Sequence, residues 1–241
     1  IMYNMQGIIR KNINNATSQF ERLGYVGTNF ANYSTNGYKA VRFEQMLSED
    51  GYVHGAVRTD YQKGSLKITG NPYDVAIDGE GFIPIVSPDG EVAYTRDGSF
   101  KRGKDGYLLT NDGWVVGAGI KLPANLYKFQ IKPDGRVFTY ESAMDSKGKC
   151  LGTIPVVQFD CPEGLQQDSH GNRVWQTEES GEPQLVKNHN MITQNYLENS
   201  NTNIYTSVNE MLRLNASMLA SMSVLKMTDD MYNKSINIRE S

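Results

Sequence analysis

The residues best suited to catalysis are scattered along this 241-residue chain and form no catalytic pattern. His54, His170 and His189 lie far apart in polar surroundings, which favours solvated side chains over a general base or a metal ligand. The chain also lacks a G-x-S-x-G nucleophile elbow, a phosphate-binding P-loop and an H-E-x-x-H zinc motif. The sequence therefore predicts no catalytic residue, no metal site and no cofactor.

Acidic residues recur in a different pattern, as Asp-Gly pairs. These pairs lack the alternating acidic spacing and the terminal Glu of a calcium-binding loop. Asp-Gly is instead a strong signal for a two-residue hairpin turn, because both positions accept a positive φ. We therefore expect turns at six places, which begin at Asp78, Asp89, Asp97, Asp105, Asp112 and Asp134.

The two cysteines, Cys150 and Cys161, are too few for a disulfide framework. The sequence favours two free thiols, and no His lies close enough in sequence to suggest a zinc site with them. A disulfide in an oxidising compartment stays open as an alternative, because the ten intervening residues can close a loop.

Charge and hydropathy narrow the class of partner. The net charge is −3, from 24 basic and 27 acidic residues that are well mixed, so we expect no nucleic-acid partner. No apolar run approaches the roughly 20 residues that span a bilayer. Residues 1–30 lack the basic start and the apolar stretch of a secretory signal. We expect the chain to stay in the cytoplasm or to leave by a route without a cleaved signal, and a trimmed signal is the alternative.

The distribution of Gly and Pro indicates the elements that position these residues. All eight prolines lie between Pro72 and Pro183, and no glycine follows Gly181. Because both residues break helices, the two ends of the chain are predicted to be helical. In the N-terminal segment, apolar residues repeat every seven residues with a companion row four residues later, which predicts one apolar seam. The rows are Met2, Ile9, Ala16, Leu23 and Phe30, and Ile13 and Phe20.

The C-terminal segment carries a longer row in which steps of four and three residues alternate. The row contains Ile204, Val208, Met211, Asn215, Met218, Met222, Leu225, Asp229, Tyr232 and Ile236. Only Asn215 and Asp229 are polar, and a polar residue in such a seam often fixes its register. An ordinary amphipathic helix is the alternative reading, but two such helices at opposite ends of the chain must find partners.

Short β-rich runs alternate with turn signals between the two helices, which predicts an antiparallel meander that closes into a small barrel or sandwich. Residues 160–190 look polar and loop-like. We therefore predict an α+β fold, in which the N- and C-terminal helices pair as a coiled coil and the central part of the chain forms a mainly antiparallel β domain. The predicted domains are residues 1–36 plus 195–241 for the helices, 37–66 for an extended linker and 67–194 for the β domain.

The junction between the first helix and the β region carries the most specific motif. Residues 29–39 read N-F-A-N-Y-S-T-N-G-Y-K. Its Ser, Thr, Asn and Gly residues favour caps and turns, so it is predicted to lead the chain out of the helix. The motif resembles the A-N-N-L-A-N-x-x-T-x-G-[FY]-K signature of bacterial flagellar rod and hook proteins, with Thr28 and Phe30 in place of the usual Asn and Leu.

Three further blocks resemble the same family in the correct order. Residues 69–82 match T-G-N-x-x-D-V-A-I-x-G-x-G-F, residues 94–100 match Y-T-R-D-G-S-F, and residues 196–203 match Y-L-E-x-S-N-V-N with Thr202 for Val. The resemblance covers essentially the whole chain. It departs at residues 216–219, where relatives carry an Arg-Ala-Tyr-Glu-like run, so contacts made by that Arg and Tyr are not carried over.

The resemblance implies a structural subunit of the flagellar rod, with no catalytic residue. Its implied partners are further copies, other rod and hook subunits, the flagellar type III export apparatus and the surrounding envelope rings. Its implied place is the basal body in the periplasm and cell envelope, reached without a cleaved signal. The short linker between Ala40 and Gln62 favours a proximal rod protein, whereas residues 94–100 look more like a distal one. A hook or hook-associated protein, or a secreted β-barrel enzyme or adhesin, are the alternatives.

The resemblance and the seams together define the residues expected to carry assembly. Helical ends with apolar seams are poorly stabilised alone and gain burial on stacking. We expect Met218→Asp to abolish assembly and to leave the β domain folded. The expected assembly residues are Ile9, Ile13, Ala16, Phe20 and Leu23 in the first helix, Asn29, Ala31, Asn32, Thr35, Gly37 and Tyr38 in the signature, and Ile204, Val208, Met211, Met218, Met222 and Leu225 in the second helix.

Overall fold

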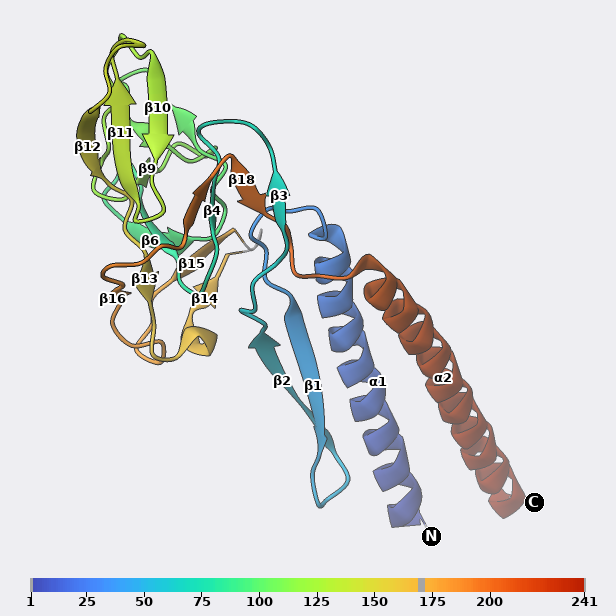
Figure 1. The fold of residues 1–241 in the computed structure, drawn as a ribbon. Coiled ribbons are helices and arrows are strands. Elements are labelled where there is room, and N and C mark those ends of the chain that lie inside the picture. The colour runs from blue at the N-terminus through green and yellow to red at the C-terminus, as the bar shows by residue number, and fades with distance from the viewer. Residues whose placement is uncertain (1, 169–171, 241) are drawn as a thin grey trace. The chain divides into compact units, whose positions relative to one another are not determined.

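The computed structural model describes residues 2–168 and 172–240, which fold into two compact units (Figure 1). The helical unit consists of Ile1–Ala31, Val41–Thr59 and Thr202–Ser241, and the β unit of Asn32–Ala40 and Asp60–Asn201. The predicted α+β fold, with helical ends and a central β region, is confirmed.

Two long helices, α1 (Met2–Ala31) and α2 (Ile204–Glu240), run antiparallel in the helical unit (Figure 1). Their direction follows from two contacts, because Gln19 bonds Ser217 whereas the later Arg22 bonds the earlier Glu210. Asn203 caps the start of α2, because its Oδ1 accepts hydrogen bonds from the backbone amides of Tyr205 and Thr206.

The segment predicted as an extended linker contains a β-hairpin that belongs to the helical unit. Strand β1 (Val41–Leu47) pairs antiparallel with β2 (Val53–Thr59), from Val41 opposite Thr59 to Leu47 opposite Val53. The prediction overlooked Asp50-Gly51, which carries the same turn signal as the six pairs named above. The domain boundaries given above, at residues 36, 66 and 194, stay a prediction.

The β unit is built around a seven-stranded antiparallel sheet with the order β14-β15-β6-β5-β9-β8-β7. Its strands are β5 (Ile83–Val86), β6 (Val92–Thr95), β7 (Lys101–Arg102), β8 (Leu108–Leu109), β9 (Val115–Val116), β14 (Gln166–Gln167) and β15 (Arg173–Trp175). Hence β14 and β7 form its two edges.

Smaller sheets complete the β unit, and each paired set is antiparallel. A three-stranded sheet contains β10 (Lys128–Ile131), β11 (Arg136–Tyr140) and β12 (Lys149–Thr153). The two-stranded pairs are β13 (Val157–Gln158) with β16 (Gln184–Leu185), β17 (Ile192–Gln194) with β4 (Val75–Ile77), and β18 (Tyr196–Glu198) with β3 (Leu66–Ile68). The predicted loop over residues 160–190 is wrong in part, because it holds β14, β15, β16 and the 3₁₀ turn η1 (Pro162–Gly164).

The core of the β unit is a cluster of fourteen buried apolar residues that includes Ile83, Val137 and Ile154. A second cluster is aromatic, and in it the Phe159 ring meets the Tyr94 and Phe82 rings edge to face, with centroids 4.9 and 6.0 Å apart. Such contacts add to the stabilisation from burial alone. The β unit therefore has the interior of an independently packed domain.

Five Asp-Gly turns share one geometry, which differs from the predicted two-residue turn. In the turn at residues 87–91, the Ser87 amide donates to Glu91 O at 2.8 Å and the Gly90 amide donates to Ser87 O at 3.0 Å. Gly90 has φ of +91°, which only glycine adopts readily. This is the three-residue loop that ends in a left-handed glycine. The same pattern recurs at residues 48–52, 103–107, 110–114 and 132–136.

Two of the six expected pairs do not form such turns. Gly79 and Gly98 lack the positive φ of the other four glycines. Gly98 is required for close backbone approach, because a Cβ there would lie 1.6 Å from the carbonyl oxygen of Val75.

Candidate assembly surface

The helix pair buries one row of side chains on α2. The row advances by steps of three and four residues, and it is buried most fully at Ser207, Leu214 and Met218. The predicted positions 204, 211, 218 and 225 lie on this row. The predicted positions between them, 208, 215 and 222, each fall one residue after the position that turns inward. Positions 207, 214, 221 and 228 turn inward, and Val208 and Met222 are exposed. The predicted row followed the apolar residues and so passed over the small polar Ser207 and Ser221.

Helix α1 uses two faces within the helical unit. One face meets α2, where the Gln19 Nε2 donates to Ser217 Oγ at 3.0 Å. The other face meets the hairpin, where the Tyr25 ring stacks on Phe43 with centroids 5.5 Å apart. Side chains on the remaining side of α1, such as Phe20, are left to solvent.

Two asparagines fasten the hairpin to α1. Asn29 Nδ2 donates to the Val41 carbonyl at 2.7 Å, and the Val41 amide donates to Asn29 Oδ1 at 2.8 Å. Asn14 makes the same two bonds with Val53, at 3.1 and 2.7 Å. Each amide side chain thus satisfies both backbone groups of the first residue of a strand. Asn29 was a predicted signature residue, and Asn14 was missed because no periodic pattern includes it.

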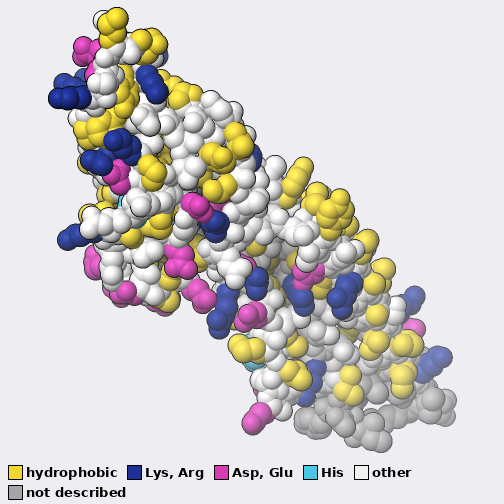
Figure 2. All heavy atoms as spheres, viewed as in Figure 1, with side chains coloured by type: hydrophobic (Ala, Val, Ile, Leu, Met, Phe, Trp, Pro, Cys, Tyr) yellow, Lys and Arg dark blue, Asp and Glu magenta, His cyan; other side chains and the backbone are white. Residues whose placement is uncertain are grey.

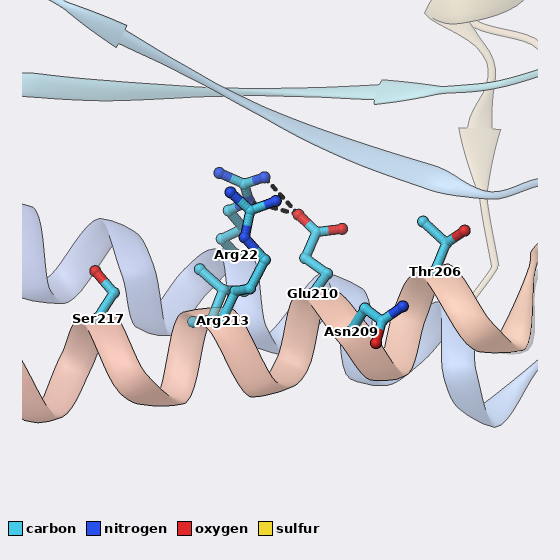
Figure 3. Close-up of a pocket in the computed structure, with 7 residues that line it drawn as sticks. Arg22, Thr206, Asn209, Glu210, Arg213 and Ser217 are labelled. Atoms are coloured by element: carbon cyan, nitrogen blue, oxygen red, sulfur yellow. Dashed lines mark hydrogen bonds and ion pairs between the residues drawn. The ribbon is translucent and has the colours of Figure 1, made fainter.

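An open groove of about 490 Å³ lies beside the helix pair (Figure 3). In it the Arg22 guanidinium reaches Glu210 Oε1 through Nε at 2.8 Å and Nη2 at 2.5 Å. Because both side chains are about one-third exposed, this ion pair contributes at most about 1 kcal/mol. The groove is lined by Arg22, Thr206, Asn209, Glu210, Arg213, Leu214 and Ser217.

A second, outward row on α2 is apolar and exposed. Leu212, Leu219 and Met222 are 63%, 60% and 58% exposed, and Val208 lies on the same row. A helix with apolar residues on several sides is typical of one that is surrounded by other elements. Figure 2 shows hydrophobic side chains along the exposed side of the helices. The described residues of the helical unit therefore leave this apolar strip uncovered.

The predicted assembly residues of the helices divide between the two sides. Ile13, Phe20, Val208 and Met222 are exposed, and Met218 is buried in the helix pair. The remaining residues are half-buried, namely Ile9, Ala16, Leu23, Ile204, Met211 and Leu225. Their role in contacts between copies stays a prediction.

The signature after α1 forms the predicted turn. Ala31 ends α1 and is exposed, and Asn32 accepts hydrogen bonds from the Thr35 amide and hydroxyl at 3.1 and 3.0 Å. Gly37 has φ of +68°, and a Cβ there would lie 2.6 Å from the backbone of Arg96. Tyr38 is buried, and this burial raises the pKa of its phenol to about 12. These residues shape the β unit, so a direct role in contacts between copies stays a prediction.

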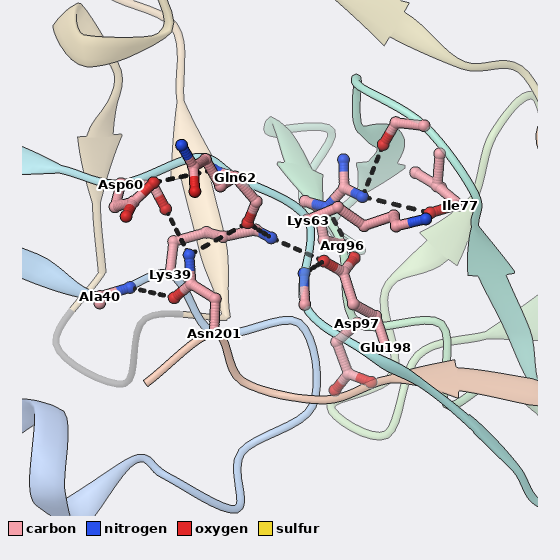
Figure 4. A network of polar contacts seen from close by, with 12 residues as sticks. Lys39, Ala40, Asp60, Gln62, Lys63, Ile77, Arg96, Asp97, Glu198 and Asn201 are labelled. Atoms are coloured by element: carbon pink, nitrogen blue, oxygen red, sulfur yellow. Dashed lines mark hydrogen bonds and ion pairs between the residues drawn. The ribbon is translucent and has the colours of Figure 1, made fainter. Parts of the chain in front are cut away.

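A buried ion cluster joins three distant parts of the chain in the β unit (Figure 4). Glu198 Oε1 accepts from Lys39 Nζ at 2.6 Å, and its Oε2 accepts from Arg96 Nε at 2.7 Å. The Gly64 amide also donates to Oε1 at 2.7 Å. Arg96 donates further bonds to the carbonyl oxygens of Gly81 and Gly79. The cluster therefore satisfies its carboxylate and, with these backbone partners, holds five segments together.

Electrostatics make Glu198 the centre of that cluster. The three charged side chains are at most 4% exposed. Burial lowers the pKa of the Lys39 ammonium, the Arg96 guanidinium lowers it further, and the Glu198 carboxylate opposes both effects. Every charge has a partner, so the cluster suits a structural role. All three residues occur in the quoted sequence blocks, but neither periodicity nor spacing indicated that they meet.

Asn201 closes the same region. Its Oδ1 accepts from the Ala40 amide at 2.7 Å, and its Nδ2 donates to the Asp60 carbonyl at 2.7 Å (Figure 4). The segments around Ala40, Asp60 and Asn201 are thus bonded to one another where they leave the β unit. Asn201 was also missed as a site residue.

The residues considered for chemistry have varied surroundings. His54 is exposed, as expected, but His189 is buried and its Nδ1 has no partner among the described residues, so the prediction of a solvated side chain is wrong there. His170 lies outside the described residues. Cys150 and Cys161 are free and exposed, which confirms two free thiols.

The residues that the structure describes contain neither a cluster suited to a metal ion nor a helix suited to a membrane. No group of His, Cys, Asp and Glu within residues 2–168 and 172–240 is arranged to hold a metal ion. Neither described helix is long and apolar enough to cross a membrane.

Comparison with known proteins agrees with the sequence blocks. Residues 76–139 match the flagellar hook protein FlgE/F/G D1 domain. The chain is 32% identical over 211 residues to the flagellar basal-body rod protein FlgF of Mesorhizobium japonicum, which covers 80% of each chain. It is 28% identical over 240 residues to FlgG of Buchnera aphidicola subsp. Baizongia pistaciae, covering 88% of this chain and 92% of the relative. FlgG of Bacillus subtilis is 27% identical over 253 residues, covering 90% and 93%.

Proposed function

This chain belongs to the family of flagellar basal-body rod proteins, and we propose that it builds the rod by helical polymerisation through its terminal helices and so transmits torque. The family is structural, and the function is not enzymatic. The rod subunit assembles with other flagellar axial proteins in the basal body.

The outward apolar row of α2 is the observation that carries the proposal. Each large apolar side chain that passes from water into a packed contact contributes about 1.5–3 kcal/mol. Four such side chains on one strip, Val208, Leu212, Leu219 and Met222, supply a substantial drive for association. A contact between different surfaces of identical copies produces an open helical filament when its rotation does not close a ring.

Further parts of the proposal rest on the family alone. They are contacts with further copies and with rod and hook subunits, passage through the flagellar type III export apparatus, a position inside the surrounding envelope rings, and a periplasmic location. The Met218→Asp variant alone does not separate assembly from folding, because Met218 is buried within the chain itself. Its neighbour Leu219 points outward and so separates assembly from folding.

The test compares Leu219→Asp, Met218→Asp and the control Asn209→Asp, which adds the same charge on the polar groove side of α2. Leu219→Asp should leave the unfolding curve of the monomer unchanged and abolish polymerisation, measured by sedimentation and electron microscopy. Met218→Asp should weaken the helix pair as well, and Asn209→Asp should polymerise. Normal filaments from Leu219→Asp would show that the outward row does not carry assembly.

A further inference from the structure

Basic and acidic side chains are gathered in different parts of the β unit. Strand β7, with Lys101 and Arg102, forms one edge, and β14 forms the other. Strand β14 directly follows the turn η1, which contains Glu163. In Figure 2 the dark blue side chains gather toward the part of the β unit with β10–β12, and the magenta ones toward the part with β14 and β16. Positive and negative side chains are therefore concentrated in different parts of the β unit.

The basic edge contains a groove. It has a volume of about 390 Å³, and four of its lining residues are cationic whereas one, Asp105, is anionic. Apolar groups, among them Leu122 and Leu151, also line it. Arg102 Nη2 donates to the Pro123 carbonyl at 2.8 Å, which holds one cation at the groove. The cationic lining residues are Arg102, Lys104, Lys121 and Lys149.

The acidic edge is a compact surface built from two segments, residues 160–164 and 177–184. The Cys161 amide donates to the Ser180 carbonyl at 3.3 Å, and Gln184 Nε2 donates to Asp160 Oδ1 at 2.7 Å. The two segments contain no Lys or Arg. Their exposed acidic residues are Asp160, Glu163, Glu178, Glu179 and Glu182. We call these five residues the acidic edge.

We propose that the basic groove of one copy binds the acidic edge of a second copy, so that β units join head to tail in the rod. This inference rests on the proposed self-assembly and adds a contact that the helices do not make. The complementary charges favour a second copy as the occupant over an unrelated anion, because both surfaces are present on every chain. Since the two surfaces differ, the contact is head to tail, and it extends along a filament when its rotation does not close a ring.

The exposed charges also predict how the contact responds to salt. Charges at such a rim attract one another over a Debye length of about 8 Å at physiological ionic strength. Added salt should therefore weaken this contact far more than it weakens the apolar contact between helices. This difference separates the two interfaces of the same filament.

The two native cysteines provide the probe. Cys150 follows the groove residue Lys149, and Cys161 lies beside Asp160 in the acidic edge, and both thiols are exposed. A short bis-maleimide added to assembled protein should link Cys150 of one copy to Cys161 of the next. A head-to-tail contact produces a ladder of linked chains, whereas a symmetric contact through one cysteine stops at dimers. Cys150→Ser or Cys161→Ser should abolish the ladder.

Charge-reversal variants test whether electrostatic attraction brings the basic groove and the acidic edge together. Lys104→Glu with Lys121→Glu should reduce cross-linking at least tenfold, and so should Glu178→Lys with Glu179→Lys. All four changes together should restore it, because complementary charges return with the opposite sign. Lys187→Glu, an exposed reversal outside the groove, is the control. Mono-maleimide labelling and thermal unfolding confirm that every variant keeps reactive thiols and its fold.

The outcomes separate this inference from the proposed function. A native chain that never polymerises would overturn the proposed function and this inference with it. Filaments that form normally, depend on Leu219 and show no Cys150–Cys161 ladder would overturn the contact between β units alone. A ladder that survives both charge reversals would likewise overturn the electrostatic contact. A ladder lost in each reversal and regained in the fourfold variant would support it.

Discussion

The two units of this chain are packed in different ways. The β unit has fourteen apolar residues in one buried cluster and an ion cluster whose charges are all paired. Among the side chains of the helical unit that the structure describes, the buried apolar ones are Val26, Leu214 and Met218, and the polar Ser18, Gln19 and Ser207 are also buried. A polar, thinly packed interior stabilises a unit weakly. The β unit thus has a closed core of its own, and we propose that the helical unit gains further burial from contacts with other molecules.

The exposed surfaces show the same contrast. Among the described side chains, fifteen of the twenty-two large exposed apolar residues belong to the smaller helical unit. Scattered exposed apolar residues are normal, but a continuous strip along one helix marks a surface that another molecule covers. The difference between the two units supports the proposal that assembly covers the apolar surface which the helical unit leaves exposed.

The largest expected effect comes from breaking the ion cluster of the β unit. Glu198→Gln leaves Lys39 and Arg96 buried without their carboxylate, so we expect a loss of about 3–5 kcal/mol in the free energy of unfolding. Denaturant unfolding followed by tyrosine and tryptophan fluorescence measures it. Adding Lys39→Met should recover part of the loss, because one stranded charge is removed. An unchanged midpoint in Glu198→Gln would show that the cluster does not stabilise the unit.

Truncating one buried aliphatic side chain to Ala in each unit sharpens the comparison of their packing. Ile154→Ala opens a cavity in a closed core and should cost about 4 kcal/mol. Leu214→Ala lies beside the open groove, where water replaces the lost methyl groups, so we expect about 2 kcal/mol. Hydrogen exchange of each unit provides the measurement. Equal losses would contradict the difference in packing.

A smaller and more local effect is expected at Asn29. Asn29→Ala removes two hydrogen bonds to Val41, which should cost about 1–3 kcal/mol and loosen the hairpin from α1. Asn29→Asp keeps the acceptor and loses the donor, so its effect should be intermediate. Faster amide exchange in β1 and β2 without a change in the β unit would confirm this assignment. No change in hairpin exchange would refute it.

The smallest expected effect is a pH dependence from Asp97. Burial raises the pKa of its carboxyl group, the Ser99 hydrogen bonds oppose this, and Asp112 and Asp74 raise it further. Since the folded-state pKa lies above the unfolded one, this group's stabilising contribution is present in acid and is lost as pH rises through the folded-state pKa. Asp97→Asn should therefore raise stability at pH 7, and its advantage should vanish toward pH 3. A benefit that does not change with pH would contradict this cause.

Part of the fold could be predicted because local signals decide it. The lack of Pro in both terminal segments and of Gly after Gly181 marks the helical ends, and the predicted turn at Asp134 lies between β10 and β11. The hairpin β1–β2 was missed although Asp50-Gly51 carries the turn signal, because its strands were taken for a linker. Short strands in residues 160–190 were missed because their polar side chains give no alternating pattern.

The site was predicted only in part, for physical reasons. A helix that is apolar on several sides gives no preference between positions 207 and 208, so the sequence alone could not choose the inward row. In the ion cluster, Glu198 contacts residues that lie 102 and 159 positions away in the sequence. These side chains meet only because the whole β unit packs around them. Asn14 contacts only backbone groups of a hairpin that the prediction did not contain.

The central claim is that the helical unit completes its burial only in the assembly. Hydrogen exchange of α2 amides over residues 204–234, measured on the monomer and on assembled filaments, tests it most directly. We predict fast exchange in the monomer, strong protection in the filament, and a β unit protected equally in both. Protection of α2 in the monomer as strong as that of the β unit would contradict the claim.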